Sequence, residues 1–108
     1  GALSGKYRNG QMPKNSRMKL FKGWERMINP LAMKAYDEYF KLAKDYNMSM
    51  VQLAQAFVNS RPFVTSNIIG ATTMDQLKEN VESVEIKLTE EIIEKINLIH
   101  NDNPNPSP

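Results

Sequence analysis

The chain has 108 residues, about the size of one small domain, and 41% of its residues are hydrophobic while 24% are charged. It contains no cysteine and one histidine, which excludes disulfides, thiolate metal sites and a histidine-rich metal cluster within it. No apolar run approaches the roughly 20 residues that cross a bilayer, and no signal-peptide pattern opens the chain. We therefore expect a cytoplasmic protein without a membrane partner or a metal site.

The formal net charge of +2 conceals an uneven distribution of charge. Residues 1–50 contain ten Lys or Arg against four Asp or Glu, whereas residues 51–108 contain four against eight. An excess of basic residues near the N-terminus favours an anionic partner there. The same charges are also compatible with a loop that only faces solvent.

The first segment predicts a long loop. Residues 8–29 are rich in Gly, Pro, Asn, Ser and basic residues and show no apolar periodicity. Loops of more than about 20 residues are uncommon in compact domains and are usually functional or disordered. The opening Gly1-Ala2-Leu3 has no initiator Met and reads as the continuation of a preceding element, so we expect a fragment.

Helices are expected after this loop. Asn29 as N-cap and Pro30 at the first helical position predict an amphipathic helix over residues 30–46. Ser49 and Gln52 form a capping-box pattern that opens a second helix, apolar nearly all round. We expect this second helix to be deeply buried.

The second half of the chain predicts two more helices and one strand. Thr73 and Gln76 form another capping-box pattern, and Thr89 caps a last helix. A β-branched run over residues 65–69, ended by Gly70, is the strong strand signal. A lone strand cannot form a sheet, because its backbone donors and acceptors need neighbours. The run therefore predicts either an edge that joins a sheet outside this chain or self-association through the unpaired strand.

The most informative stretch lies between that strand and the next helix. A strand, Gly70, the hydroxyl residues Thr72 and Thr73, and a helix start together favour an anion site, because free backbone N–H groups point outward there. Glu79 and Asn80 follow about two turns into the helix, where they can reach a base beyond a phosphate. A plain strand-to-helix connection is the alternative, since neither a P-loop nor a Rossmann pattern is present.

Four segments stand in a fixed order along the chain: Ser4–Tyr7 with Ser16-Arg17, Met50–Val58, Gly70–Asn80, and Leu88–Glu91 before a Pro-studded tail. Together they resemble the C-terminal part of the aldo-keto reductases, which are (β/α)8 TIM barrels, and within that family the Tas-like branch. The resemblance implies a fold that is the C-terminal part of such a barrel. The chain itself is then mostly α-helical with one short β-strand.

The resemblance also implies a cofactor site for NADPH or NADP. Lys6 and Arg17 would contact the cofactor phosphates, Thr72 would donate its hydroxyl, and Gly70 would let the backbone approach. Gln76 stands where many family members have an Arg on the 2′-phosphate, which leaves the preference for NADP over NAD open.

The adenine end of the site would lie further into the helix. The resemblance implies that Glu79 and Asn80 contact the adenine. The catalytic Asp, Tyr, Lys and His of the family come from the first half of the barrel, and no residue here matches them. The parent protein would transfer hydride from NADPH to an aldehyde or ketone, while this chain alone would be inactive and bind cofactor weakly or not at all.

In this interpretation the chain has three parts. Residues 1–29 are a cofactor-side loop, residues 30–100 supply the last helices and the last strand, and residues 101–108 form a flexible tail.

Two alternatives come from other classes of protein. The helices over residues 30–46 and 49–60 also fit a helix-turn-helix, with Lys44, Gln52, Gln55 and Asn59 available to DNA. However, the second of these helices carries no Lys or Arg and is too apolar for an anionic groove, so we expect no nucleic-acid partner. A structural helical adaptor that binds no nucleotide is the third interpretation.

Overall fold

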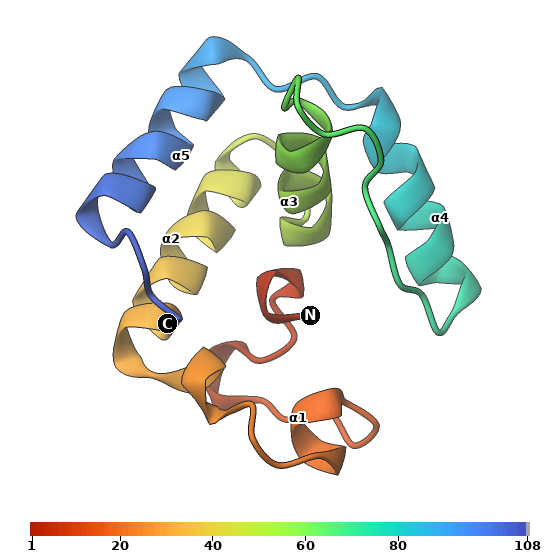
Figure 1. The fold of residues 1–108 in the computed structure, drawn as a ribbon, viewed down its shortest axis with the longest axis vertical. Helices are drawn as coiled ribbons and strands as arrows, with labels where there is room; N and C mark the ends of the chain where they lie inside the picture. The colour runs from red at the N-terminus through yellow and green to blue at the C-terminus, as the bar shows by residue number, and fades with distance from the viewer. Residues whose placement is uncertain (108) are drawn as a thin grey trace.

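The computed structural model describes residues 1–107, with Glu25 described by its backbone alone, and it consists of helices joined by irregular segments (Figure 1). Within these residues the α-helices are α1 (Arg17–Leu20), α2 (Pro30–Asp45), α3 (Met50–Asn59), α4 (Met74–Glu82) and α5 (Glu90–Asp102). Short 3-10 turns are η1 (Ala2–Ser4), η2 (Arg8–Gly10), η3 (Glu25–Ile28) and η4 (Ser83–Glu85). The prediction of a mostly helical chain is confirmed.

The starts of α2 and α3 follow the predicted capping residues. Asn29 Oδ1 accepts the backbone N–H of Ala32 at 2.9 Å, with Pro30 in the first turn of α2. At α3, Ser49 Oγ accepts from Gln52 N at 3.0 Å, and Ser49 N donates to Gln52 Oε1 at 2.9 Å. Both bonds of the capping box are therefore formed, and they satisfy backbone donors that the helix itself leaves open.

The later helices are capped as expected, with one difference. Thr73 Oγ1 accepts from Gln76 N at 3.2 Å, and Thr89 Oγ1 accepts from Ile92 N at 3.3 Å. The side chain of Gln76, however, accepts from Thr72 N instead of the N–H of the N-cap residue Thr73. The capping box predicted for α4 is thus only half formed, because the reciprocal bond goes to the preceding residue.

The apolar core lies among α2, α3 and α5, and Figure 1 shows α2 running between the other two helices. Burial of apolar surface is the main force holding such an arrangement together. Its buried members are Ala32, Tyr36, Leu42, Ala43, Met50, Leu53, Ile92 and Ile96.

Helix α3 is packed by several elements but is less enclosed than expected. It contacts η1, α2, α4 and η4, and its buried residues are Met50, Leu53 and Ala56. Val51 and Val58 are only half-buried, so the expectation of a deeply buried helix is correct for one face of α3 only. These contacts make α3 an internal element, and nothing in the described residues favours its use as a DNA-reading helix.

The prediction of a strand over residues 65–69 is wrong. Residues 1–107 contain no β-strand, and the segment between α3 and α4 has no regular structure. Ile68 is 96% exposed. The physical reason is that a strand is completed by the backbone of a neighbouring strand, and no described residue supplies one.

The C-terminal tail lies against the start of α2. Asn103, which is buried, donates from Nδ2 to the carbonyl oxygen of Leu31 at 2.7 Å. Asn29 Nδ2 donates to the carbonyl oxygen of Pro106, also at 2.7 Å. These bonds show where the tail lies, while its flexibility stays a prediction.

Candidate functional site

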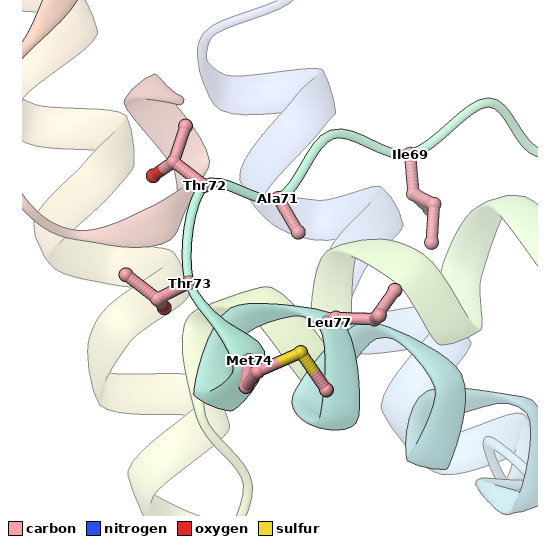
Figure 2. Close-up of a pocket in the computed structure, with 6 residues that line it drawn as sticks. All are labelled: Ile69, Ala71, Thr72, Thr73, Met74 and Leu77. Carbon is pink, nitrogen blue, oxygen red and sulfur yellow. The ribbon is translucent and has the colours of Figure 1, made fainter.

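The first candidate group lies where the irregular segment meets the start of α4 (Figure 2). An open hollow of about 370 Å³ is lined there by Ile69, Ala71, Thr72, Thr73, Met74 and Leu77. Figure 2 shows the side chains of Thr72 and Thr73 on one side of the turn and those of Ile69 and Leu77 on the other. The turn therefore has one apolar side and one polar side.

The polar side gathers hydrogen-bond donors on a single oxygen. Gln76 Oε1 accepts from Thr72 N at 2.8 Å and from Thr72 Oγ1 at 3.1 Å. All three groups belong to exposed residues. An oxygen that receives a backbone N–H and a hydroxyl beside a helix start occupies the kind of position that suits an oxygen of an anion.

The charge at this helix start is unfavourable to an anion. Asp75 lies in the first turn of α4, where its carboxylate already interacts with the positive end of the helix dipole. A phosphate held by Thr72 and Gln76 would face that carboxylate. Any positive charge that balances it has to come from outside the first turn of α4.

Glu79 and Asn80 are both engaged in hydrogen bonds. Ser49 Oγ donates to Glu79 Oε1 at 2.5 Å. Asn80, only 7% exposed, donates from Nδ2 to the carbonyl oxygen of Gly70 at 3.3 Å and accepts at Oδ1 from Gln55 Nε2 at 3.4 Å. Asn80 therefore ties the segment before α4 to the helix itself and to α3.

A network of amides that sequence reasoning did not assign to the site supports this arrangement. Asn67 Nδ2 donates to Gln55 Oε1 at 2.5 Å and to Asn59 Oδ1 at 3.0 Å. Gln55 and Asn59 lie one turn apart on a mostly apolar helix, and this spacing is the signal in the sequence that could have identified them. In the helix-turn-helix alternative these two amides contact DNA, whereas in the structure both accept from Asn67 and hold the segment on α3.

Packing does not require a glycine at position 70. A Cβ added there would meet nothing within 4 Å. The role of Gly70 in letting a ligand approach the backbone stays a prediction.

The second candidate group is the pair of cations Lys6 and Arg17. Lys6 Nζ lies 5.3 Å from the ring centroid of Tyr7, and Arg17 Cζ lies 5.3 Å from the ring centroid of Trp24. The charges of Lys6 and Arg17 both act on the backbone nitrogen of Gly1. The two side chains thus act on one region, at the amino end of the chain.

This cationic cluster, formed by Lys6 and Arg17, has no paired carboxylate among the side chains that the structure describes. No such carboxylate lies within 4.0 Å of Lys6 or Arg17, whereas the neighbouring Arg8 is paired with Asp37. Two positive side chains that lie near each other repel one another and attract anions. The cluster therefore suits a phosphate better than it suits a neutral ligand.

The two groups remain separate in the structure. No hydrogen bond or ion pair in the described part of the chain joins Lys6 or Arg17 to the start of α4. Figure 1 shows the loop with α1 and the N-terminal end of α4 toward the same part of the molecule. The assignment of all seven residues to one cofactor site stays a prediction.

Among the side chains that the structure describes, which leave out Glu25, no three His, Cys, Asp or Glu gather closely enough to hold a metal ion. No helix within residues 1–107 combines the length and apolarity needed to cross a membrane.

Comparison with known proteins relates nearly the whole chain to one family. A family model described as "Aldo/keto reductase family" matches residues 1–101. The chain is similar to Protein tas of Escherichia coli (strain K12), with 40% identity over 108 residues, covering 100% of this chain and 31% of that protein. It is also similar to a probable voltage-gated potassium channel subunit beta of Oryza sativa subsp. japonica, with 31% identity over 110 residues, covering 96% and 33%.

A third relative is named by its reaction. L-glyceraldehyde 3-phosphate reductase of Escherichia coli (strain K12) is 33% identical over 89 residues, covering 78% of this chain and 25% of that protein. The chain spans about a third or less of the length of these curated relatives.

Proposed function

Because the chain belongs to the aldo/keto reductase family, we propose that it forms the part of an NADPH-dependent reductase that binds the adenosine and phosphate end of the cofactor. The observation that carries the proposal is the convergence of Thr72 and Gln76 at the start of α4 in a chain of this family. The proposed cofactor residues are Lys6, Arg17, Gly70, Thr72, Gln76, Glu79 and Asn80.

The donors at the start of α4 fit a phosphate oxygen. An oxygen of the 2′-phosphate accepts from the N–H and hydroxyl of Thr72 in place of Gln76 Oε1. Gln76 then turns its amide, so that Nε2 donates to the same phosphate. Lys6 and Arg17 supply the positive charge that balances the phosphate and Asp75.

The adenine lies beside the next turn of α4 in this proposal. Glu79 Oε1 is occupied by Ser49, so its second carboxylate oxygen faces the base. The two hydrogen bonds of Asn80 are long, at 3.3 and 3.4 Å, and contacts to adenine replace them at little cost. The preference for NADP over NAD then depends on Lys6 and Arg17, because Gln76 is neutral.

The chemistry belongs to the parent protein. NADPH supplies a hydride to an aldehyde or ketone, and the protein binds and orients the cofactor. The name of one relative, L-glyceraldehyde 3-phosphate reductase, supports a carbonyl substrate. We assign no catalytic residue to this chain, and we propose that residues 1–29, 30–100 and 101–108 serve as cofactor-side loop, barrel helices and tail.

The proposal is tested by cofactor binding to the protein expressed from its complete coding sequence. Arg17→Ala and Lys6→Ala are each expected to weaken NADPH binding about 10-fold at low salt, and less at high salt, because exposed charges are screened. Lys44→Ala is the matched control, since Lys44 is an exposed cation on α2 outside the proposed site. Unchanged affinity in both site variants contradicts the proposal.

The 108-residue chain offers a second test. We expect it to bind 2′-phospho-AMP weakly, at about −4 to −6 kcal/mol, and to show no NADPH-dependent reduction of aldehydes. Chemical-shift mapping should perturb Thr72, Gln76, Glu79 and Asn80 first. Shifts confined to α2, or steady NADPH oxidation by material free of host reductases, argue against this assignment.

A further inference from the structure

Arg8 is held on the surface of α2 by two different interactions. Its Nε lies 2.9 Å from Asp37 Oδ1, and its Cζ lies 3.5 Å from the ring centroid of Phe40. The Arg8 side chain is 19% exposed, although it belongs to a loop of mostly exposed residues. An ion pair and a stacked guanidinium on one helix face restrict the side chain far more than an exposed ion pair alone.

The backbone around Arg8 is restrained as well. Arg8 N donates to the carbonyl oxygen of Gly5 at 3.1 Å, which closes a turn over residues 5–8. Gly5 has φ 79°, and a Cβ there would lie 3.1 Å from Met50 Sδ of α3. Tyr7 is 3% exposed. The turn is thus pinned to α3 at Gly5 and to α2 at Arg8, and Lys6 projects from between these two points.

We propose that Arg8, with Asp37 and Phe40, is a positioning residue for the cofactor phosphates. The inference rests on the proposed function, because it assigns Arg8 the task of fixing Lys6 within the cationic cluster. Arg8 acts through the turn and makes no contact with the cofactor. Releasing Arg8 from α2 lets the turn move, and a displaced cation loses much of its interaction with a bound phosphate.

Positioning and simple attraction predict opposite results for one substitution. Asp37→Asn removes a negative charge close to the cluster, so attraction by net charge predicts tighter binding of an anion. Positioning predicts weaker binding, because Arg8 loses its partner. Phe40→Leu changes no charge, and positioning again predicts weaker binding.

The test uses the protein expressed from its complete coding sequence, with NADPH affinity measured by calorimetry across a range of salt concentrations. Arg8→Ala, Asp37→Asn and Phe40→Leu are each expected to raise the Kd about 5- to 10-fold, at temperatures where thermal melts show every variant folded. The slope of log Kd against log salt should become shallower, because Lys6 no longer pairs fully with phosphate.

Arg61→Ala is the matched control. Arg61 is another stacked arginine, with its Cζ 4.6 Å from the ring centroid of Phe57 at the end of α3, and it lies outside the cofactor loop. The Arg61→Ala variant should bind NADPH with an unchanged Kd.

Each outcome separates the inference from the proposed function. Tighter binding of NADPH by Asp37→Asn overturns the positioning role alone. The same holds if Arg8→Ala, Asp37→Asn and Phe40→Leu all leave the Kd unchanged while Lys6→Ala weakens binding. Unchanged Kd for both Lys6→Ala and Arg17→Ala overturns the cofactor site, and the inference falls with it.

Discussion

The bundle of α2, α3 and α5 and the region of α4 with the segment before it are built from similar kinds of sequence, yet they are held in different ways. The bundle buries its apolar stripes, as at Leu53 and Ile96, which are 4% and 7% exposed. On α4 the apolar residues Met74, Leu77 and Val81 are 75%, 40% and 57% exposed. The region of α4 is held by a cap and by amide hydrogen bonds. A capped, periodic sequence therefore specifies a helix without specifying its burial.

The largest expected difference between the two regions concerns their apolar side chains. Leu53→Ala should destabilise the chain by about 2–5 kcal/mol, because it removes buried contacts and leaves a cavity. Met74→Ala should change stability by less than about 0.5 kcal/mol, since that side chain is mostly in water. Urea unfolding of both variants measures the contrast. Similar losses in both would show that Met74 has a packing partner in solution.

A polar substitution should act on the region of α4 alone. Asn80→Ala removes the side-chain donor to the carbonyl oxygen of the exposed Gly70, which should cost about 0.5–1.5 kcal/mol locally. Amide hydrogen exchange should accelerate over residues 64–82 and stay unchanged in α5. Uniform acceleration across the chain would instead mean that α4 and the bundle unfold as one cooperative unit.

The two regions can also be compared through their N-cap residues, because α4 and α5 each begin with a threonine cap. Thr73→Ala and Thr89→Ala each remove one N-cap side chain, which costs about 1 kcal/mol. Thr73→Ala should reduce helix content, because little packing keeps α4 formed, whereas Thr89→Ala should lower the unfolding midpoint and leave α5 helical. Circular dichroism with thermal melts distinguishes these results. Equal loss of helix content would contradict the contrast.

The smallest expected effect is the acid response of the bundle. A hydrogen bond from Tyr46 and the neighbouring Lys95 lower the pKa of Glu91, whose Oε1 lies 2.7 Å from Tyr46 Oη. A lowered folded-state pKa contributes stability above the ordinary carboxyl pKa, and that stability is lost as the pH falls through the lowered value. Glu91→Gln should therefore lose slightly less stability than the natural chain between neutral and acid pH. An identical loss in both proteins would exclude this contribution.

The candidate site shows how far local sequence patterns reach. The stretch from Gly70 to Asn80 could be identified from residues that are close in sequence, and Thr72 and Gln76 do meet at the start of α4. Gln55 and Asn67 were missed as supports, because their contact joins α3 to an irregular segment with no pattern of its own.

By itself, the sequence determined where α2, α3, α4 and α5 begin, but not the short α1, which lies inside the predicted loop over residues 8–29. Asn29, Ser49, Thr73 and Thr89 each bond a backbone N–H three residues ahead, so the information lies within one helical turn. Family membership was also readable from ordered segments, because it depends on residue identity and spacing rather than on contacts.

Only the tertiary structure decided what those helices pack against and what the irregular segments do. Residues 65–69 have the composition of a strand but do not form one, because the hydrogen bonds of a strand need the backbone of a neighbouring strand. Arg8 meets Asp37 across 29 positions, and Asn29 meets Pro106 across 77. Such pairs leave no periodic trace in the sequence, since their geometry arises from the packing of whole helices and not from neighbouring residues.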